Sequence, residues 1–315
     1  MAGKRRKDSS MSRSKRRSFW TQRYGRLRGW QWCAAVLLAA GLLISCAMLV
    51  HQAVEDRRTA AIIARNRELA RAGQTEAPAE VTPAPLQATP EPSAEPTESA
   101  PTPTPYAAVT SASAPLTSAG TVDLLALRRL NVDTVGWLTM DSVKSIDFAV
   151  VQGRNAYYLS HDFDNRENAY GTPFLDEGSP LAASPDNLIV YAHNMRNGEM
   201  FGELNRVLET GRFVEQPYVH FQTIFGSRDY IPYAVCDISV DTKSANYMQY
   251  YMPYFTGPGQ FIDYVYRAER VSRVTLPWHA QYGDQLLTLV TCGKERSERL
   301  VVFLRAIRST EIVTN

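Results

Sequence analysis

A run of nineteen largely apolar residues near the N-terminus constrains this chain more than any other feature. It extends from Trp32 to Val50 and contains no charged residue. About twenty such residues span the hydrocarbon core of a bilayer as a helix. A cleaved signal peptide is the alternative, but the run is long, and the charged segment 55–58 follows without a small-residue cleavage site. We therefore expect an uncleaved transmembrane helix over residues 31–51.

Charge distribution predicts the orientation of this helix. Residues 1–30 hold eleven Lys and Arg and one acid, so this tail carries +10, while the whole chain carries +2 and the remainder −8. The positive-inside rule makes 1–30 a cytoplasmic tail and places everything after His51 outside a cell membrane crossed once. The basic cluster also suggests nucleic-acid binding, but it is short and abuts the apolar run. We expect no nucleic-acid partner.

Composition divides the rest of the chain into three parts. Residues 52–72 are rich in Ala, Arg and Glu and predict a juxtamembrane helix. Residues 73–120 are rich in Pro, Thr and Ser and hold ten of the eighteen prolines, which predicts a disordered linker. Residues 121–315 are long enough for one well-formed core and form the predicted extracellular domain.

Strand-like segments dominate residues 121–315. A helix is expected at 122–131, and the insertion 246–270 carries a helical pattern at 260–266, either as a wall of a binding site or for stability alone. The fold class is therefore mainly β, a barrel or sandwich with inserted helices. The strand candidates are 135–140, 146–152, 187–192, 218–223, 230–240, 273–276, 286–292 and 300–307.

Cys292 ends the apolar run 286–292, and Arg299 opens the next apolar run after six polar or glycine residues. Both runs suit strands, so a hairpin is the simplest structure. Alternation places Cys292 and Arg299 on matching faces, where cross-strand neighbours lie about 5 Å apart. A thiolate that attacks a carbonyl creates an oxyanion, which a neighbouring cation stabilises. If only these two residues are considered, the alternative to a catalytic pair is a buried structural cysteine next to a charged residue that caps the hairpin.

His193 follows the short apolar strand 187–192 and, like Cys292, stands where a strand passes into a loop. Catalytic groups are often found at such positions, although a structural histidine is the alternative. Cys236 is the other cysteine outside the apolar run, and the sequence does not exclude a bridge to Cys292. No Cys/His cluster has zinc spacing and no glycine loop suits phosphate, so we expect no metal and no cofactor.

Several motifs, taken in their order and spacing, resemble the sortase family, the cysteine transpeptidases of Gram-positive cell surfaces. The resemblance spans nearly all of residues 121–315. The N-terminal helix, the His-Asn-Met context and the helix-bearing insertion make the chain most like class B. The motifs are Thr288-Leu289-Val290-Thr291-Cys292, Arg299-Leu300-Val301-Val302, Val190-Tyr191-Ala192-His193-Asn194-Met195, and the segments 131–138, 150–159, 171–176 and 200–204.

The resemblance implies a closed eight-stranded β-barrel with an N-terminal helix and a helix-containing insertion before the cysteine strand. It also implies that Cys292 attacks a threonine carbonyl in the C-terminal sorting motif of a secreted protein. His193 is then the acid and base, Arg299 binds the substrate carbonyl or oxyanion, and an amine of a cell-wall precursor or a pilin resolves the thioacyl enzyme. The implied substrate groove is lined by Asn155, Leu159, Thr242, Tyr247, Met248, Val290 and Thr291.

Two features depart from the family pattern. Ala192 stands where the family usually has glycine, and the loop from Cys292 to Arg299 is shorter than in many class B members. Arg296 and Arg305 are therefore competitors for the role of Arg299. The alternatives from other classes are a membrane-tethered binding module without turnover and a cysteine hydrolase, because both use the same residue types. The sequence does not choose between wall anchoring and pilus assembly.

Overall fold

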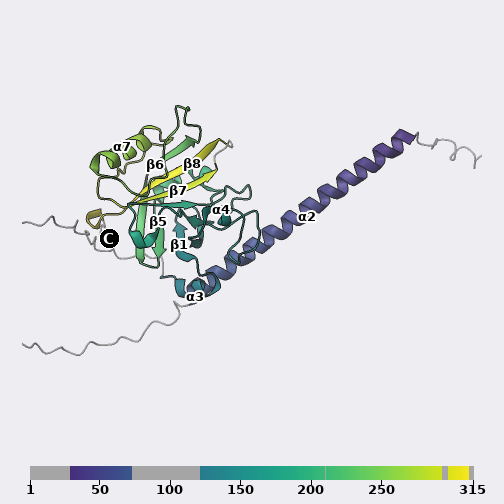
Figure 1. Cartoon of the computed structure of the whole chain (residues 1–315), viewed down its shortest axis with the longest axis horizontal. Helices are drawn as coiled ribbons and strands as arrows, with labels where there is room; N and C mark the ends of the chain where they lie inside the picture. The colour runs from purple at the N-terminus through teal and green to yellow at the C-terminus, as the bar shows by residue number, and fades with distance from the viewer. Residues whose placement is uncertain (1–28, 73–120, 210, 293–296, 312–315) are drawn as a thin grey trace, which may run out of the picture. The chain divides into compact units, whose positions relative to one another are not determined.

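Eight strands form a closed barrel in the order β1-β2-β3-β4-β7-β8-β6-β5 (Figure 1). The computed structural model describes residues 29–72, 121–209, 211–292 and 297–311; most of the predicted basic tail and the predicted linker 73–120 lie outside these ranges. The barrel confirms the predicted fold class. The strands are β1 Thr134–Met140, β2 Asp147–Val151, β3 Phe174–Leu175, β4 Asn187–Tyr191, β5 Val219–Thr223, β6 Gly226–Ser239, β7 Leu286–Cys292 and β8 Glu298–Ala306.

Helices precede the barrel and occupy several of its connections. The expected helix at 122–131 is confirmed as α3, and the helical pattern at 260–266 is the centre of α7. The helices are α2 Gly29–Ala72, α3 Leu124–Leu130, α4 Asn155–Tyr158, α5 Leu204–Glu209, α6 Arg212–Glu215 and α7 Pro258–Arg270, with short 3₁₀ turns at Leu181–Ala183 and Ser309–Glu311.

One predicted strand is wrong and one strand was missed. Residues 273–276 form no strand; the N–H of Arg273 donates to the Val235 carbonyl at 2.7 Å, and the N–H of Val235 donates to the Ser272 hydroxyl at 3.0 Å. The Ser272 hydroxyl thus accepts the hydrogen bond that the backbone carbonyl of a neighbouring strand would accept. The missed strand, β3, has two residues, which is too short to show an alternating pattern, and tertiary pairing with β2 and β4 defines it.

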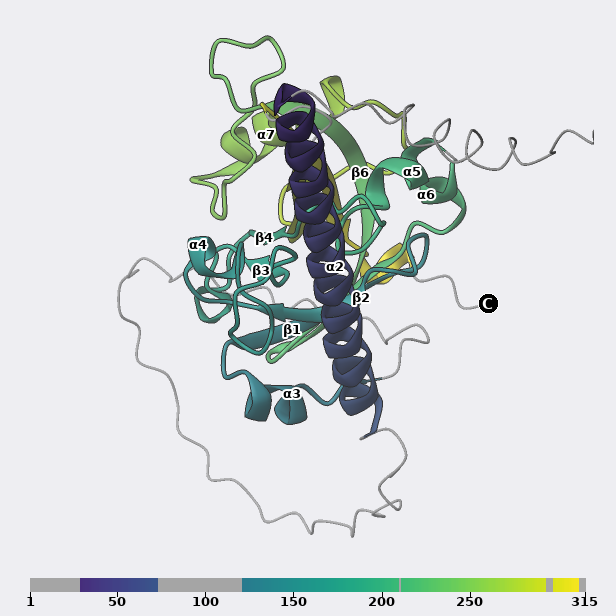
Figure 2. The same cartoon turned by 90° about the vertical axis from the view of Figure 1, so that its right-hand side faces the viewer.

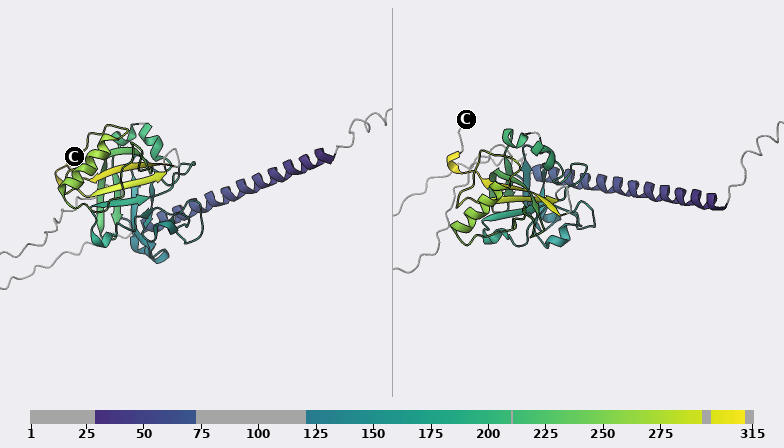
Figure 3. Two further views of the ribbon diagram at one scale, coloured as in Figure 1. Left: turned by 45° about the horizontal axis from the view of Figure 1, so that its top comes forward. Right: turned by 90° about the horizontal axis from the view of Figure 1, so that it is seen from above.

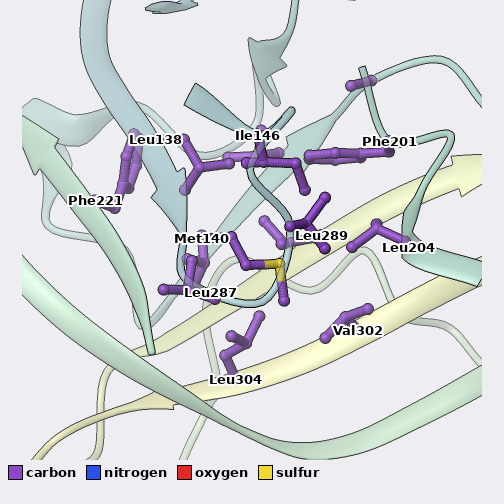
Figure 4. Packing of buried hydrophobic residues seen from close by; sticks show 14 of the residues in the cluster. Leu138, Met140, Ile146, Phe201, Leu204, Phe221, Leu287, Leu289, Val302 and Leu304 are labelled. Carbon is purple, nitrogen blue, oxygen red and sulfur yellow. The ribbon is translucent and has the colours of Figure 1, made fainter. Parts of the chain in front are cut away.

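Strand β7 is buried on both faces. Leu287 and Leu289 point into the barrel interior among residues such as Met140 and Val302 (Figure 4). Leu286 and Val290 face the other way, into a second cluster with buried side chains of α7, which lies along the yellow strands in both views of Figure 3. Burial on both faces explains why β7 reads as a continuous apolar run.

The compact unit that contains the barrel begins at Arg58, within α2. The chain divides into units Met1–Arg57 and Arg58–Asn315. In the second unit, Ile62 and Ile63 are each 8% exposed, and the N–H of Asp123 donates to the Ala70 carbonyl at 2.9 Å. The predicted juxtamembrane segment 52–72 is thus continuous with the apolar helix before it, and its part from Arg58 onward packs with the domain predicted at 121–315. By length and composition, α2 is apolar enough to cross a membrane.

The α2 segment should contribute measurably to stability. Burial of an isoleucine side chain is worth roughly 1.5 to 3 kcal/mol. We expect a protein that begins at residue 121 to unfold at a clearly lower urea concentration than one that begins at Arg58. Urea unfolding followed by circular dichroism measures this difference. Equal unfolding midpoints for the two proteins would show that the segment does not stabilise the barrel.

His220 forms a buried charged cluster on the outer side of β5. Its Nδ1 lies 2.7 Å from Oδ1 of Asp229, and its Nε2 lies 3.4 Å from Oδ1 of Asp141. Burial alone would lower the pKa of the imidazole, but the hydrogen bond and charge of Asp229, together with Asp141, outweigh it and raise the pKa above 6.5. The folded state therefore favours the charged ring.

This raised pKa predicts how stability changes with pH. A raised folded-state pKa stabilises the fold fully below the unfolded-state pKa, and the contribution is lost as pH rises through the folded-state pKa. Replacing His220 by Gln should cost about 1.5 to 3 kcal/mol below about pH 6, the range for a hydrogen bond between charged groups. The cost should shrink at higher pH, as urea unfolding of residues 58–315 measures. A cost that grows with pH would contradict this assignment.

Candidate active site

Three adjacent strands bring the three predicted catalytic residues into one row. β4 and β7 are parallel, with Tyr191 opposite Val290, and β7 and β8 are antiparallel, with Cys292 opposite Arg299. The hydrogen bond from the Ala192 N–H to the Val290 carbonyl continues the β4–β7 register past the end of β4. Two residues beyond the Tyr191–Val290 pair, this register places His193 opposite Cys292. Alternation places His193 and Arg299 on the outer face that α7 partly covers, and the register sets both beside the backbone position of Cys292.

A backbone carbonyl fixes the imidazole of His193. The ring is half-buried, and its Nε2 lies 2.7 Å from the carbonyl oxygen of Leu159, which follows α4. A carbonyl only accepts, so Nε2 carries the proton and the neutral ring offers Nδ1 as its base. The helix α4 and strands β3 and β4 lie together on one side of the domain (Figure 2). Leu159 therefore enters the site through its main chain as well as its exposed side chain.

Arg299 is half-buried beside a tyrosine that the sequence analysis did not select. Its Nη1 donates to the Glu298 carbonyl at 2.9 Å. Burial raises the pKa of the Tyr250 phenol, while the charge of Arg299 and a hydrogen bond with it oppose the rise. The phenol thus lies against the guanidinium. The repeated tyrosines of 247–254 were the available signal, but nothing in their spacing singles out Tyr250.

The competing arginines do not share this position. Arg305 is 2% exposed and binds Glu311 through two hydrogen bonds of 2.6 Å. It pairs with Leu286, six residues along β7 from Cys292, or roughly 20 Å at the rise of a strand. Arg296 lies outside the described residues. Among the described arginines of the hairpin, Arg299 is the one opposite Cys292.

Cys236 has the properties of a structural cysteine. It is a free thiol with no exposed surface, and its Sγ donates to the Ala268 carbonyl at 3.2 Å. Burial, with a smaller contribution from the charge of Asp237, raises the pKa of the thiol. A thiol held in its protonated form is a poor nucleophile. The structure thus contains no bridge from Cys236 to Cys292.

The residues predicted to line the substrate groove fall into separate environments. Asn155 is tied to the segment after β3, because its Nδ2 donates to Asp176 Oδ2 and its Oδ1 accepts from the Glu177 N–H, both at 2.9 Å. Leu159 is 47% exposed beside His193. Thr242 is exposed and Tyr247 half-buried in the segment between β6 and α7. Val290 and Met248 are 1% and 4% exposed in the cluster under α7.

Thr291 lies apart from the predicted groove. Alternation along β7 puts it on the same face as Leu289, toward the barrel interior. It is 3% exposed, and its hydroxyl has no hydrogen-bond partner among the described residues.

This position predicts that Thr291 can be replaced without loss of substrate affinity. Valine has the same shape, and it removes a buried hydroxyl whose burial costs about 1 to 3 kcal/mol. We expect Thr291→Val to keep or raise the unfolding free energy and to leave the KM for a peptide substrate unchanged. Thermal unfolding and steady-state kinetics test the two parts, and a large rise in KM would return Thr291 to the groove.

Comparison with known proteins agrees with this geometry. A family model described as "Sortase domain" matches residues 138–307, more than half of the chain. The chain belongs to the sortase family. Sortases are cysteine transpeptidases, and the matched segment contains all three residues of the row.

The relatives of this sortase are of class B. It is 29% identical to sortase B of Listeria monocytogenes over 175 residues, which are 55% of this chain and 68% of the relative. It is 26% identical to sortase B of Staphylococcus aureus over 187 residues, 58% of this chain and 74% of the relative. The solved structure of Clostridium perfringens sortase B matches with a TM-score of 0.52 and 27% identity, covering 57% of this chain and 97% of that one.

Proposed function

We propose that this sortase is a membrane-anchored transpeptidase that uses Cys292, His193 and Arg299 to join secreted proteins to an amine at the cell surface. The observation that carries the proposal is the row of these residues across β4, β7 and β8. Anchoring by α2 with a cytoplasmic N-terminus is supported by its apolar length and by the basic residues that precede it.

In the first half-reaction Nδ1 of His193 takes the proton of the Cys292 thiol, and the resulting thiolate attacks the carbonyl carbon of a threonine in the sorting motif. A C–S bond forms, and the carbonyl oxygen becomes an oxyanion that the Arg299 guanidinium stabilises. The oxyanion collapses and breaks the C–N bond to the next residue. The departing amine takes a proton from Nδ1 of His193, the nitrogen that the Leu159 carbonyl leaves available.

The second half-reaction reverses these steps with a new amine. The acceptor amine gives a proton to Nδ1 of His193 and attacks the thioester. A new C–N bond forms, the C–S bond breaks, and the thiolate of Cys292 is restored. No metal or cofactor takes part in this scheme, and atoms and protons balance over the cycle.

The proposed partners are secreted proteins with a C-terminal sorting motif and an amine acceptor. The resemblance to the sortase family implies an amine of a cell-wall precursor as the acceptor. The alternative acceptor is a pilin lysine, which uses the same chemistry. In the proposed groove, Asn155, Leu159, Thr242 and Tyr247 line the sorting motif, and the buried Met248 and Val290 pack beneath it.

Substitution of the three residues tests the mechanism. Cys292→Ala should abolish cleavage of sorting-motif peptides, and Arg299→Lys, which keeps the charge but loses the planar fork, should lower kcat about 10²-fold. Cys236→Ala provides the matched control, because it removes the barrel's other thiol and should leave the rate unchanged. Mass spectrometry of residues 58–315 incubated with peptides and an amine acceptor measures both products.

The products separate this proposal from its alternatives. Transfer of the peptide to the amine supports a transpeptidase. Cleavage that ignores the amine identifies a hydrolase, and peptide binding with no cleavage, unchanged by Cys292→Ala, identifies a binding module.

A further inference from the structure

The loop between Ser160 and Thr172 is attached to the C-terminal part of α2. Arg58 forms an ion pair of 2.7 Å with Asp162, whose carboxylate is 3% exposed. The Thr59 hydroxyl accepts a hydrogen bond of 3.0 Å from Nδ2 of Asn168, and both residues are buried. Charged and polar groups buried in this way are costly to leave unpaired. These two contacts therefore tie α2 to two defined points of the loop.

The same two loop residues organise the loop itself. Oδ1 of Asp162 accepts hydrogen bonds of 3.0 Å from the backbone N–H groups of Asp164 and Arg166. The N–H of Asn168 donates to the Ser160 carbonyl at 2.8 Å, and its carbonyl accepts from the N–H of Gly171 at 3.1 Å. A shift of Asp162 or Asn168 is thus passed along the loop to Gly171.

Gly171 packs directly against the peptide group that follows α4. It has a φ of +60°, and a Cβ placed on it would collide with the Tyr158 carbonyl oxygen and lie 3.0 Å from that of Leu159. The N–H of Thr172 also donates to the Tyr158 carbonyl at 3.0 Å. Only glycine accepts both the backbone conformation and this approach. Gly171 and Thr172 therefore contact the Tyr158 carbonyl, and Gly171 also lies against the Leu159 peptide group.

The Leu159 carbonyl is the group that holds Nε2 of His193 at 2.7 Å. A continuous series of direct contacts thus leads from α2 through the loop to the imidazole. We propose that Arg58 and Thr59 of α2 are positioning residues for His193, which act through the loop 160–172 and the Leu159 carbonyl to keep the proton on Nε2. The proposal rests on the role of His193 proposed above.

The chemical consequence concerns which ring nitrogen is free. With Nε2–H bound to Leu159, the neutral ring presents Nδ1 for proton transfer. Without this partner both tautomers become populated, and the fraction of molecules with a correctly placed base falls. The effect should appear in kcat, because the imidazole exchanges protons during bond making and breaking rather than during peptide binding.

The seam between α2 and the loop is incompletely filled by side chains. A cavity of about 30 Å³ lies there, and Thr59, Asn66, Gly171 and Thr172 are among its lining residues. Apolar side chains such as Ile62 and Phe163 pack beside this cavity, and the polar contacts add direction to that packing.

The helix also supplies an internal control. Arg71 forms an ion pair of 2.7 Å with Asp147, which belongs to β2 rather than to the loop. Arg67 contacts the same carboxylate at 3.1 Å, so Asp147 keeps a partner when Arg71 is replaced. Arg71→Met thus removes an arginine contact of the same helix without touching the series that leads to His193.

The test compares Arg58→Met/Thr59→Val, Thr59→Val alone and Arg71→Met in the full chain in detergent micelles. The ¹⁵N spectrum of the histidine rings, assigned with His193→Gln, reports the tautomer, and peptide transfer reports kcat and KM. We expect the wild type and Arg71→Met to show the Nε2–H tautomer. The double variant should show a mixture and lose about tenfold in kcat, with the peptide KM within about twofold of wild type.

Identical tautomers and kcat in the double variant and Arg71→Met would overturn the proposal. If the double variant fails to fold, Thr59→Val alone decides, because it removes one hydroxyl and keeps the side-chain shape. A smaller shift of the tautomer and of kcat in the same direction supports the proposal. No change in either overturns it. Absence of peptide transfer by the wild type would refute the proposed function instead. In that case the ring spectra still decide whether α2 positions His193.

Discussion

The lateral register of β4, β7 and β8 is the constraint on which the candidate site depends. A parallel pairing on one side of β7 and an antiparallel pairing on the other bring the ends of three chain segments to the same edge of the barrel. A slip of one residue in either pairing would turn a side chain to the opposite face. The buried leucines of β7 prevent such a slip, because it would exchange the barrel interior with the face under α7. Apolar packing thus specifies the relative positions of the polar groups.

The second requirement is that the side chains in this row keep defined orientations. His193 is held by a main-chain carbonyl rather than by a carboxylate, and Arg299 lies against the phenol of Tyr250. Backbone groups have few alternative conformations, so a carbonyl held by a packed loop is a precise partner for an imidazole. The segment of α2 from Arg58 onward extends this support beyond the barrel. In the proposal made above, activity depends on the attachment of this segment to the domain.

Prediction from the sequence was more accurate where the elements of the fold are long and periodic. The β7–β8 hairpin, the helix in α7 and the pairing of Cys292 with Arg299 follow from alternation and from the length of the runs. The two-residue strand β3 carries no periodic signal, and the segment 273–276 has strand-forming residues but meets a serine hydroxyl where a ladder partner would be. Thr291 was selected by resemblance to a motif, yet alternation itself assigns it to the interior. Tyr250 was missed because one tyrosine among several has no distinguishing spacing.

By itself the sequence determined the apolar helix, the basic tail before it, the mainly β domain and the three residue types of the site. These properties depend on local composition, periodicity and order along the chain, all of which a single sequence contains. Only the tertiary structure decided that His193 is fixed through Nε2 by Leu159, that Arg305 is engaged with Glu311, and that α2 from Arg58 onward packs with the barrel. Each of these depends on contacts between residues far apart in the chain or on side-chain direction, and neither is encoded in the spacing of a motif.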